Sequence, residues 1–378
     1  MLASQREGIP EAQRAAEPAR TGEASRATEA PAEPKLDHLA RMTDGTGMIQ
    51  HAVYSLPDRA TGYTTDDNAR ALVAALKVYE TAGSGLALRL AETYLGFLIH
   101  AQLPCGRFHN LMGYDRRFLD RVGSEDSIGR AVWGTGYACS SRAGVRLGLA
   151  AARVLERALP WLTELEAPRA RAFAALGLYH YLSACTADRT ALATLHALAD
   201  SLVESLRCSS VGQWRWFEDT LTYSNAIMPT ALLRAYARAG DRGHLEAGLG
   251  ALEFLTRHLW RDGYLKLVGH AGWYPRGGSP AEFDEQPVDA ADMVQAYAAA
   301  YSVTGDPAHH DLALAAMDWF FGRNALGLPL YDPGTGGCYD GLTPTGVNLN
   351  QGAESLVSFL LAHFAAEECR EQRRRAVA

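Results

Sequence analysis

The sequence predicts an all-α protein folded as an (α/α)6 barrel, a toroid of six helical hairpins. One helix pattern occurs three times, beginning at Asp67, Ser224 and Asp289. Each copy has alanine two and seven residues after its start, tyrosine after twelve and glycine after sixteen, and a second helical stretch follows. Glycine closes helices because it readily adopts the left-handed conformation. Repeated helical hairpins that bury their apolar faces against one another are typical of toroids and solenoids.

The ring requires six inner helices and their outer partners. Three inner helices carry the repeated pattern, and the other three are predicted from amphipathic periodicity and spacing. The inner helices are expected to begin near Asp67, Ser127, Pro168, Ser224, Asp289 and Gln351. Outer helices are expected over residues 86–103, 142–157, 189–207, 241–260 and 307–322, and a short helix over 36–43 completes the ring. Few strands are expected.

The barrel is expected to occupy residues 35–368 as one domain, because no linker divides this region into two globular halves. Residues 1–34 are rich in Ala, Glu, Arg and Pro and contain almost no large apolar side chains. We therefore expect a disordered tail. The tail mixes acids with bases and has no apolar core segment, so it fits neither a secretory signal nor a typical transit peptide. Residues 369–378 are expected to form a basic, solvated helix end.

The overall composition excludes several classes of partner. A net charge of −7 argues against binding to nucleic acid. No apolar run approaches the roughly 20 residues that a membrane helix needs, so no membrane association is expected. The six cysteines are scattered without a Cys-x-x-Cys pair, which favours reduced thiols and a cytoplasmic location. Nucleotide-binding glycine motifs, a Gly-x-Ser-x-Gly elbow and a His-Glu-x-x-His pair are absent from the sequence, and we predict neither a cofactor nor a metal.

The loops that enter the inner helices differ from those that leave them. Leaving loops are short and end on glycine, whereas entering loops concentrate glycine, aromatic and acidic residues, as in segments 62–68, 123–126, 214–219 and 283–289. Acidic residues at a helix start are more often caps than catalysts. Four acidic pairs on one rim nevertheless predict that this mouth of the barrel carries the function.

Paired carboxylates beside aromatic rings are what glycosidic chemistry requires. One acid protonates the leaving oxygen, another activates water or attacks as a nucleophile, and aromatic faces hold the sugar ring. The candidate sugar platforms are Tyr63, Trp133, Trp214, Trp216, Trp273 and Tyr274. For Trp133 and Trp216 a core position is an equally good interpretation.

Four sets of motifs resemble bacterial six-hairpin glycosidase-like proteins over about residues 36–365. They are the runs at 66–72, at 114–117 with 123–127, at 216–219 with 221–223, and at 350–355. The resemblance implies an (α/α)6 barrel that acts on carbohydrate. Many of those proteins are described as glycosyltransferases or occur beside a glycosyltransferase domain, so it also implies a glycosyltransferase as a partner. The family often has acids where this chain has Ser224 and Leu349, which favours Asp67, Asp126 and Glu218 as the catalytic residues here.

We therefore hypothesise a glycoside hydrolase-like enzyme that cleaves or transfers a glycosidic bond of an oligosaccharide, with inversion. Glu218 or Asp67 would donate the proton, and Asp126 or Asp289 would activate water. Arg130 and Asn68 would hold sugar hydroxyls. The expected substrate-binding residues are Tyr63, Asp66, Asn68, Glu125, Arg130, Trp133, Trp216, Asp219, Trp273, Asp284, Asp289, Gln351 and Glu354.

Two other classes of function remain open. The barrel could bind an oligosaccharide without turnover, as a companion of a glycosyltransferase. It could also be a sugar epimerase or lyase, which needs a histidine or tyrosine base beside the sugar. His51, His109 and His270 lie in or near entering loops and are the histidines to consider, whereas His309 and His310 are expected at the opposite end.

Overall fold

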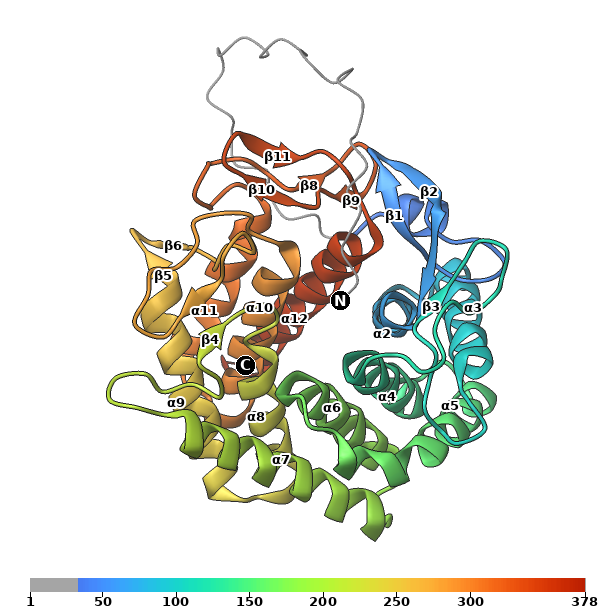
Figure 1. The fold of residues 1–378 in the computed structure, drawn as a ribbon, viewed down its shortest axis with the longest axis horizontal. Coiled ribbons are helices and arrows are strands. Elements are labelled where there is room, and N and C mark those ends of the chain that lie inside the picture. Colours follow the sequence, from blue (N-terminus) through green and yellow to red (C-terminus); the bar gives the residue numbers. More distant parts are fainter. Residues whose placement is uncertain (1–32, 378) are drawn as a thin grey trace, which may run out of the picture.

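A computed structural model describes residues 33–377 of the 378-residue chain. Residues 1–32, which make up nearly all of the predicted tail, lie outside the described part. Within it, no helix is long and apolar enough to cross a membrane. Helices dominate the fold, and they form a closed ring that is viewed down its axis in Figure 1.

Six helices of the described residues form the inner ring and confirm the (α/α)6 barrel. They are α2 (Thr65–Ala82), α4 (Glu125–Ser140), α6 (Pro168–Ala184), α8 (Ile227–Ala239), α10 (Pro287–Thr304) and α12 (Ala353–Val377). Neighbouring helices of this series contact one another, and α12 contacts α2 to close the ring. All six contribute side chains to a small axial cavity of about 60 Å³.

The outer helices lie around this ring (Figure 1). They are α1 (Asp37–Arg41), α3 (Gly85–Ala101), α5 (Val145–Ala158), α7 (Arg189–Ser209), α9 (Arg242–Leu259) and α11 (Pro307–Met317). Short 3-10 helices follow α5 and α11, as η1 (Leu159–Glu164) and η2 (Asp318–Phe320). The short α1 contacts α12. The predicted helix starts agree with the structure to within about three residues; α8, for example, was expected at Ser224 and begins at Ile227.

The repeated sequence pattern corresponds to one helix-closing geometry. Gly83, Gly240 and Gly305 end α2, α8 and α10 in the left-handed conformation, with φ of 65°, 77° and 70°. In each case the glycine N–H donates to the carbonyl oxygen of the tyrosine four residues earlier, as from Gly83 to Tyr79 at 2.8 Å. A residue with a Cβ is strained at such a position, which explains why glycine occurs there.

The strands are short, and all of them lie in segments that lead into inner helices. Before α2 and α4 lies a three-stranded antiparallel sheet of β1 (Ile49–Val53), β2 (Leu56–Thr64) and β3 (Leu111–Met112). The other pairs are β4 (Thr220–Leu221) with β7 (Tyr274–Pro275), β5 (Trp260–Arg261) with β6 (Tyr264–Leu265), β8 (Tyr331–Asp332) with β9 (Gly337–Cys338), and β10 (Gly341–Thr343) with β11 (Gly346–Asn348). These strands shape the entering loops.

Helices α4 and α6 approach each other so closely that only glycine fits at their contact. A Cβ added at Gly136 would lie 2.1 Å from the carbonyl oxygen of Gly177, and one at Gly177 would lie 2.3 Å from that of Val132. Both of these carbonyl oxygens belong to helix backbone, so they cannot move aside as a flexible side chain could. The same close approach occurs near the helix starts, where a Cβ at Gly129 would lie 2.5 Å from the carbonyl oxygen of Ala170.

Replacing glycine by alanine inside a helix usually stabilises a protein, but at this contact we expect alanine to destabilise it. Gly136→Ala and Gly177→Ala should each lower the free energy of unfolding by about 1–3 kcal/mol, because the added methyl group meets backbone. Gly96→Ala is the matched control, since Gly96 lies within α3 and a methyl group added there would meet nothing within 4 Å. There alanine should stabilise by up to about 1 kcal/mol through helix propensity. Urea unfolding measures all three variants; equal, stabilising effects would contradict the contact.

Candidate active site

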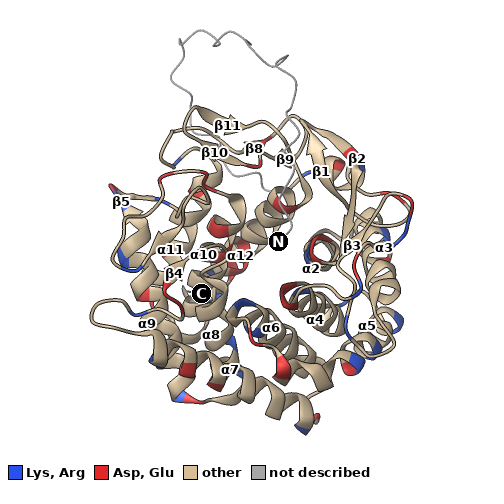
Figure 2. Ribbon diagram, in the orientation of Figure 1, with Lys and Arg blue, Asp and Glu red and all other residues tan. Residues whose placement is uncertain are grey.

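The N-terminal turns of the inner helices are joined by ionic and polar contacts at one mouth of the barrel. The Arg130 guanidinium contacts Asp66, and Arg70 Nη2 lies 3.1 Å from Glu354 Oε2, so α4, α2 and α12 are linked. Acidic and basic segments lie around the centre of the ring (Figure 2). The mouth is opposite the helix ends closed by glycine, because helices run from one to the other.

Asp66 and Asp67 begin α2 and share one arginine. Thr64 caps the helix: its hydroxyl accepts from the Asp67 N–H at 2.9 Å and donates to Asp67 Oδ2 at 2.7 Å. Arg70 Nη2 lies 2.9 Å from Asp66 Oδ1 and 3.0 Å from Asp67 Oδ1. The Asp66 side chain is 21% exposed, whereas that of Asp67 is 5% exposed. Asp66 is therefore the member of the pair that a ligand reaches first.

The surroundings push the pKa values of these two acids in opposite directions. Burial raises the pKa of Asp67, and the Arg70 charge and the Thr64 hydrogen bond only partly offset this effect. Burial acts on Asp66 too, but the charges of Arg130 and Arg70 outweigh it and hold the pKa of Asp66 below its ordinary value. The neighbouring carboxylates titrate as a pair. The pKa of Asp67 is raised to about 7, so Asp67 is partly protonated near neutral pH while Asp66 is ionised.

Asp126 lies on the adjacent inner helix, one turn before Arg130. Its Oδ2 accepts a hydrogen bond from the Tyr223 hydroxyl at 2.5 Å. Burial and the negative charge of Asp126 together raise the pKa of Tyr223, so the phenol keeps its proton and remains a donor. Asp126 is partly exposed and makes no ion pair within the described residues. It is thus a carboxylate that no cation of this part of the chain contacts directly.

Glu218 is engaged by Arg169 at the start of α6. Arg169 Nη1 donates to Glu218 Oε2 at 2.7 Å, and its other nitrogens donate to the Tyr223 carbonyl, the Thr222 hydroxyl and Asn225 Oδ1. Arg169 also covers the Tyr223 ring at 4.7 Å. This network fixes the loop before α8 and makes Glu218 a carboxylate with a fixed cationic partner.

Asp289 and His270 form a second acid–base pair at the mouth. His270 Nε2 donates to Asp289 Oδ2 at 3.0 Å, and the Ser224 backbone N–H donates to Asp289 Oδ1 at 2.7 Å. Burial raises the pKa of Asp289, although these two hydrogen bonds favour its ionised form. The His270 ring lies 4.2 Å from the Trp273 ring, centroid to centroid. A histidine oriented by a carboxylate is one arrangement for proton abstraction.

The structure adds an acid that the sequence analysis missed. Asp292 follows Asp289 by three residues on α10, is 4% exposed, and accepts at Oδ1 from Gln295 Nε2 at 3.2 Å. Its Oδ2 is buried without a hydrogen-bond partner in the described part of the chain. Burial raises the pKa of Asp292 to about 7. The spacing i, i+3 from Asp289 was the available signal, because it places both acids on one helix face.

Asp292→Asn should stabilise the protein above neutral pH. The raised pKa means that stability is lost as pH rises from the unfolded value of about 4 to about 7, because the folded state must then bury the charge. The amide keeps the shape and removes this cost, so the variant should gain on the order of 2–4 kcal/mol at pH 8 and almost nothing at pH 4. Urea unfolding across this range measures the difference; parallel curves for the two proteins would contradict it.

Several residues expected to bind substrate are instead enclosed in the protein. Tyr63 is 1% exposed and donates its hydroxyl to Asp44, and Trp216 is fully buried and stacks on Phe254. Asn68, Trp133 and Gln351 are also buried: Asn68 bonds the backbone of Met48 and Thr64, Trp133 stacks on Phe173, and Gln351 bonds Asp332 and Thr335. Trp133 lines the axial cavity. These positions hold the entering loops and the core.

Other predicted residues lie nearer the surface. Glu125 Oε2 accepts from the backbone N–H groups of Glu166 and Ala167 before α6, and Asp219 pairs with Arg276 at 3.0 Å. Asp284 is exposed, and its carbonyl oxygen accepts from the His270 N–H. Glu354 is partly exposed beside Arg70, and Trp273 beside His270.

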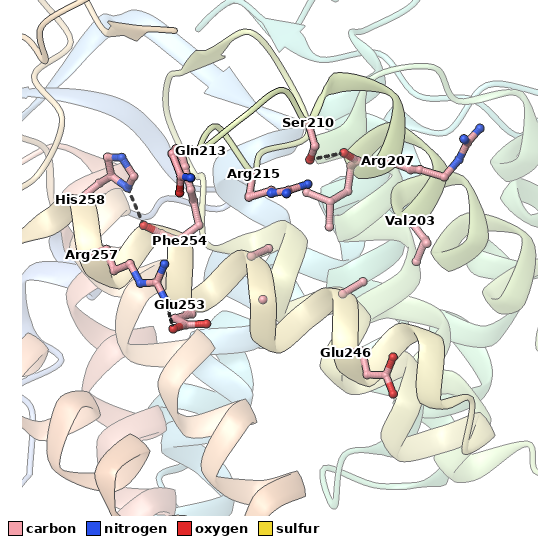
Figure 3. Close-up of a pocket in the computed structure, with 14 residues that line it drawn as sticks. Val203, Arg207, Ser210, Gln213, Arg215, Glu246, Glu253, Phe254, Arg257 and His258 are labelled. Carbon is pink, nitrogen blue, oxygen red and sulfur yellow. Dashed lines mark hydrogen bonds and ion pairs between the residues drawn. The ribbon is translucent and has the colours of Figure 1, made fainter. Parts of the chain in front are cut away.

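A larger cavity lies outside the ring, away from these acids. It has a volume of about 610 Å³ and runs between α7 and α9. Figure 3 shows Arg215, Gln213 and His258 at one part of it, with Val203 and Glu246 further along the two helices. None of the predicted site residues lines this groove.

Comparisons with known proteins show the fold. No family model and no curated protein sequence matches the chain. A D-mannose isomerase structure matches with a TM-score of 0.69 at 13% identity, over 89% of this chain and 96% of that one. The cellobiose 2-epimerase from Spirochaeta thermophila DSM 6192 matches with a TM-score of 0.66 at 15% identity, over 89% and 93%.

A glycoside hydrolase is similar as well. It is an inactive GH76 α-1,6-mannanase variant of Salegentibacter sp. HEL1_6, with two consecutive aspartates replaced by asparagine, in complex with α-1,6-mannotriose. It matches with a TM-score of 0.57 at 12% identity, over 87% of this chain and 95% of that one. The shared architecture of these sugar-processing enzymes agrees with the expected six-hairpin barrel.

Proposed function

We propose that the chain is a carbohydrate-active enzyme that cleaves or transfers a glycosidic bond of an oligosaccharide at the mouth of the barrel. The observation that carries this proposal is the Asp66–Asp67 pair, in which burial raises the pKa of Asp67 to about 7 while Arg130 and Arg70 lower the pKa of Asp66. Environments that push the pKa values of two carboxyl groups apart are what glycosidases use to separate acid from base.

In the proposed reaction, the Asp66–Asp67 pair supplies the proton. It passes to the glycosidic oxygen as the bond between that oxygen and the anomeric carbon breaks. Asp126, on the neighbouring helix, removes a proton from a water molecule as the water oxygen bonds to the anomeric carbon from the opposite side. Tyr223 holds Asp126 in place through its hydroxyl. Attack from the opposite side inverts the anomeric configuration.

The contacts of Arg130 support this division of roles. Arg130 lies one turn after Asp126 on α4 and contacts Asp66 on α2, so α4 carries both the proposed base and the cation that binds the acidic pair. Inverting glycosidases place their carboxyl groups about 6.5–9.5 Å apart to admit water. Asp126 and the Asp66–Asp67 pair begin adjacent inner helices, and our proposal requires a separation of this order between them. Trp273, partly exposed beside His270, offers a face for a sugar ring.

The mannanase comparison adds support. In that protein the inactive variant lacks two consecutive aspartates and holds a mannotriose. Asp66 and Asp67 are likewise consecutive, and they stand at the start of an inner helix. We propose a similar use of the pair here, with an oligosaccharide as substrate.

Epimerisation of a sugar is the second candidate, and the His270–Asp289 pair favours it. Among the described histidines, His270 is the one hydrogen-bonded to a carboxylate of the mouth. An epimerase would use it to remove a proton from carbon and would need a second acid to return one. Asp292, with a pKa raised to about 7, is positioned on the same helix as Asp289.

One screen separates these functions. The chain is incubated with manno-, gluco- and galacto-oligosaccharides, with and without phosphate, and products are separated by chromatography. Shorter sugars support glycosidic cleavage, and sugar phosphates identify phosphorolysis. A parallel incubation in deuterated water tests for epimerisation. Products of unchanged length that carry deuterium at a carbon next to the carbonyl would replace our proposal by epimerisation. Binding without any product would leave the alternative of a companion for a glycosyltransferase, which the engaged acids Glu125, Glu218 and Asp219 would fit.

A further inference from the structure

A second cluster of ligand-type side chains lies on the outer layer of the barrel. It contains His196 of α7 together with Asp241 and His244 at the start of α9. One donor atom of each residue lies within 4.8 Å of the others. Asp241 directly follows Gly240, which ends α8, so the cluster is at the end of the barrel opposite the acidic mouth.

His244 has a buried ring nitrogen without a hydrogen-bond partner in the described part of the chain. The residue is 1% exposed, and its Nε2 lies 2.8 Å from Asp200 Oδ1. Because an ionised carboxylate only accepts, the neutral ring must carry its proton on Nε2 and a lone pair on Nδ1. This Nδ1 has no hydrogen-bond partner among the described residues. A buried acceptor without a donor calls for an explanation, and a bound cation is one.

We propose that His196, Asp241 and His244 bind a divalent transition-metal ion, with zinc as the best fit. The ligands are one nitrogen of His196, one carboxylate oxygen of Asp241 and Nδ1 of His244, and water completes four-coordination. Two imidazoles and a carboxylate form a ligand set that zinc accepts readily. Calcium and magnesium prefer oxygen ligands alone, so they fit poorly.

Asp200 accepts a hydrogen bond from the ring nitrogen of His244 that would not bind the metal. Histidines that bind metal commonly donate their other ring N–H to a carboxylate, which fixes the tautomer and the ring orientation. The bond from His244 Nε2 to Asp200 is of this kind. Along the chain, His196 and Asp200 are four residues apart on α7, and Asp241, the N-cap of α9, precedes His244 by three residues. Each pair therefore lies on one face of its helix.

The position of the site indicates a structural role. Its ligands join α7 to α9 just before the outer groove begins, since Val203 and Glu246 follow Asp200 and His244 by less than one turn (Figure 3). A metal that bridges two helices adds its binding free energy to the stability of the folded state. The proposal is independent of the reaction at the mouth.

The test uses the full chain, without a histidine tag and after dialysis against a chelator. Zinc is titrated by calorimetry, and the melting temperature is followed at increasing zinc concentration. We expect one zinc per chain and a melting temperature that rises with zinc. Asp241→Asn should leave the melting temperature without zinc nearly unchanged, because asparagine also caps helices, and should remove the response to zinc. Asp200→Asn should weaken zinc binding about 10–100-fold.

His310→Gln is the matched control, because His310 also lies beside an aspartate, Asp311, but on another helix. It should bind zinc as the unaltered chain does. The proposal is overturned if the unaltered chain binds no more zinc than Asp241→Asn, or if the melting temperature fails to rise. It is equally overturned if His310→Gln removes binding, which would place the metal at an adventitious surface site.

Discussion

Asp67→Asn and Asp126→Asn should each lower kcat at least about a hundredfold on the oligosaccharide that the chain cleaves. The first variant removes the carboxyl group whose pKa is raised to about 7, which is the proposed proton donor. The second removes the proposed base, although an amide at this position still accepts from Tyr223. Both changes preserve shape, and asparagine replaces aspartate at a helix start at little cost, so melting temperatures should hardly change. Steady-state kinetics and thermal unfolding measure the two effects.

The control for this experiment is Asp318→Asn, which alters a half-exposed aspartate of the outer layer. Its kinetics should equal those of the unaltered chain. In the unaltered chain, kcat/KM should fall as pH rises through the raised pKa of Asp67, because the proton donor is then lost. Near-full activity of both amide variants would refute acid–base catalysis by these residues. Glu218→Gln is expected to raise KM more than it lowers kcat, since Glu218 is held by Arg169.

Arg70→Met should be the most destabilising single substitution at the mouth. Arg70 is 4% exposed and faces Asp66, Asp67 and Glu354 through one nitrogen. Removing a buried cation leaves its partner carboxylates uncompensated, which typically costs about 3–5 kcal/mol. The cost should be largest above neutral pH, where the carboxylates are ionised, and smaller in acid, where they bind protons. Urea unfolding at pH 5 and pH 8 measures both values.

Arg323→Met provides the comparison, because Arg323 pairs with Asp318 at 3.5 Å and both side chains are at least half exposed. Loss of an exposed pair should change the free energy of unfolding by about 1 kcal/mol or less at either pH. If Arg70→Met behaved in the same way, the arginine would not organise the mouth, and the lowered pKa of Asp66 would have to rest on Arg130 alone.

The fold was predictable because its signals are local. The terminal glycines take a left-handed conformation in which their N–H groups bond tyrosine carbonyls, and this geometry recurs at Gly83, Gly240 and Gly305. The starts of the inner helices could be located for the same reason. The β1–β2 hairpin was not foreseen, because only the end of β2 is buried and its outer part has no clear alternation.

The position of the candidate site could be predicted from the sequence, but the ion pairs and hydrogen bonds between its residues could not. Acids at helix starts marked the mouth, yet which of them would meet a cation depends on contacts across the ring. Arg169 reaches Glu218 over 49 residues of sequence, and Arg130 reaches Asp66 over 64. Asp292 escaped notice because it lies inside a helix rather than in an entering loop. Aromatic residues such as Trp216 look alike in sequence whether they face solvent or core.

The most direct test of the proposed reaction is a crystal structure of the double variant Asp66→Asn, Asp67→Asn with an oligosaccharide that the unaltered chain cleaves. Our account predicts that the glycosidic oxygen lies within about 2.6–3.2 Å of the side chain at position 66 or 67. The anomeric carbon should then face Asp126. A sugar that bound in the groove between α7 and α9, or with its glycosidic bond directed away from both acids, would contradict the account.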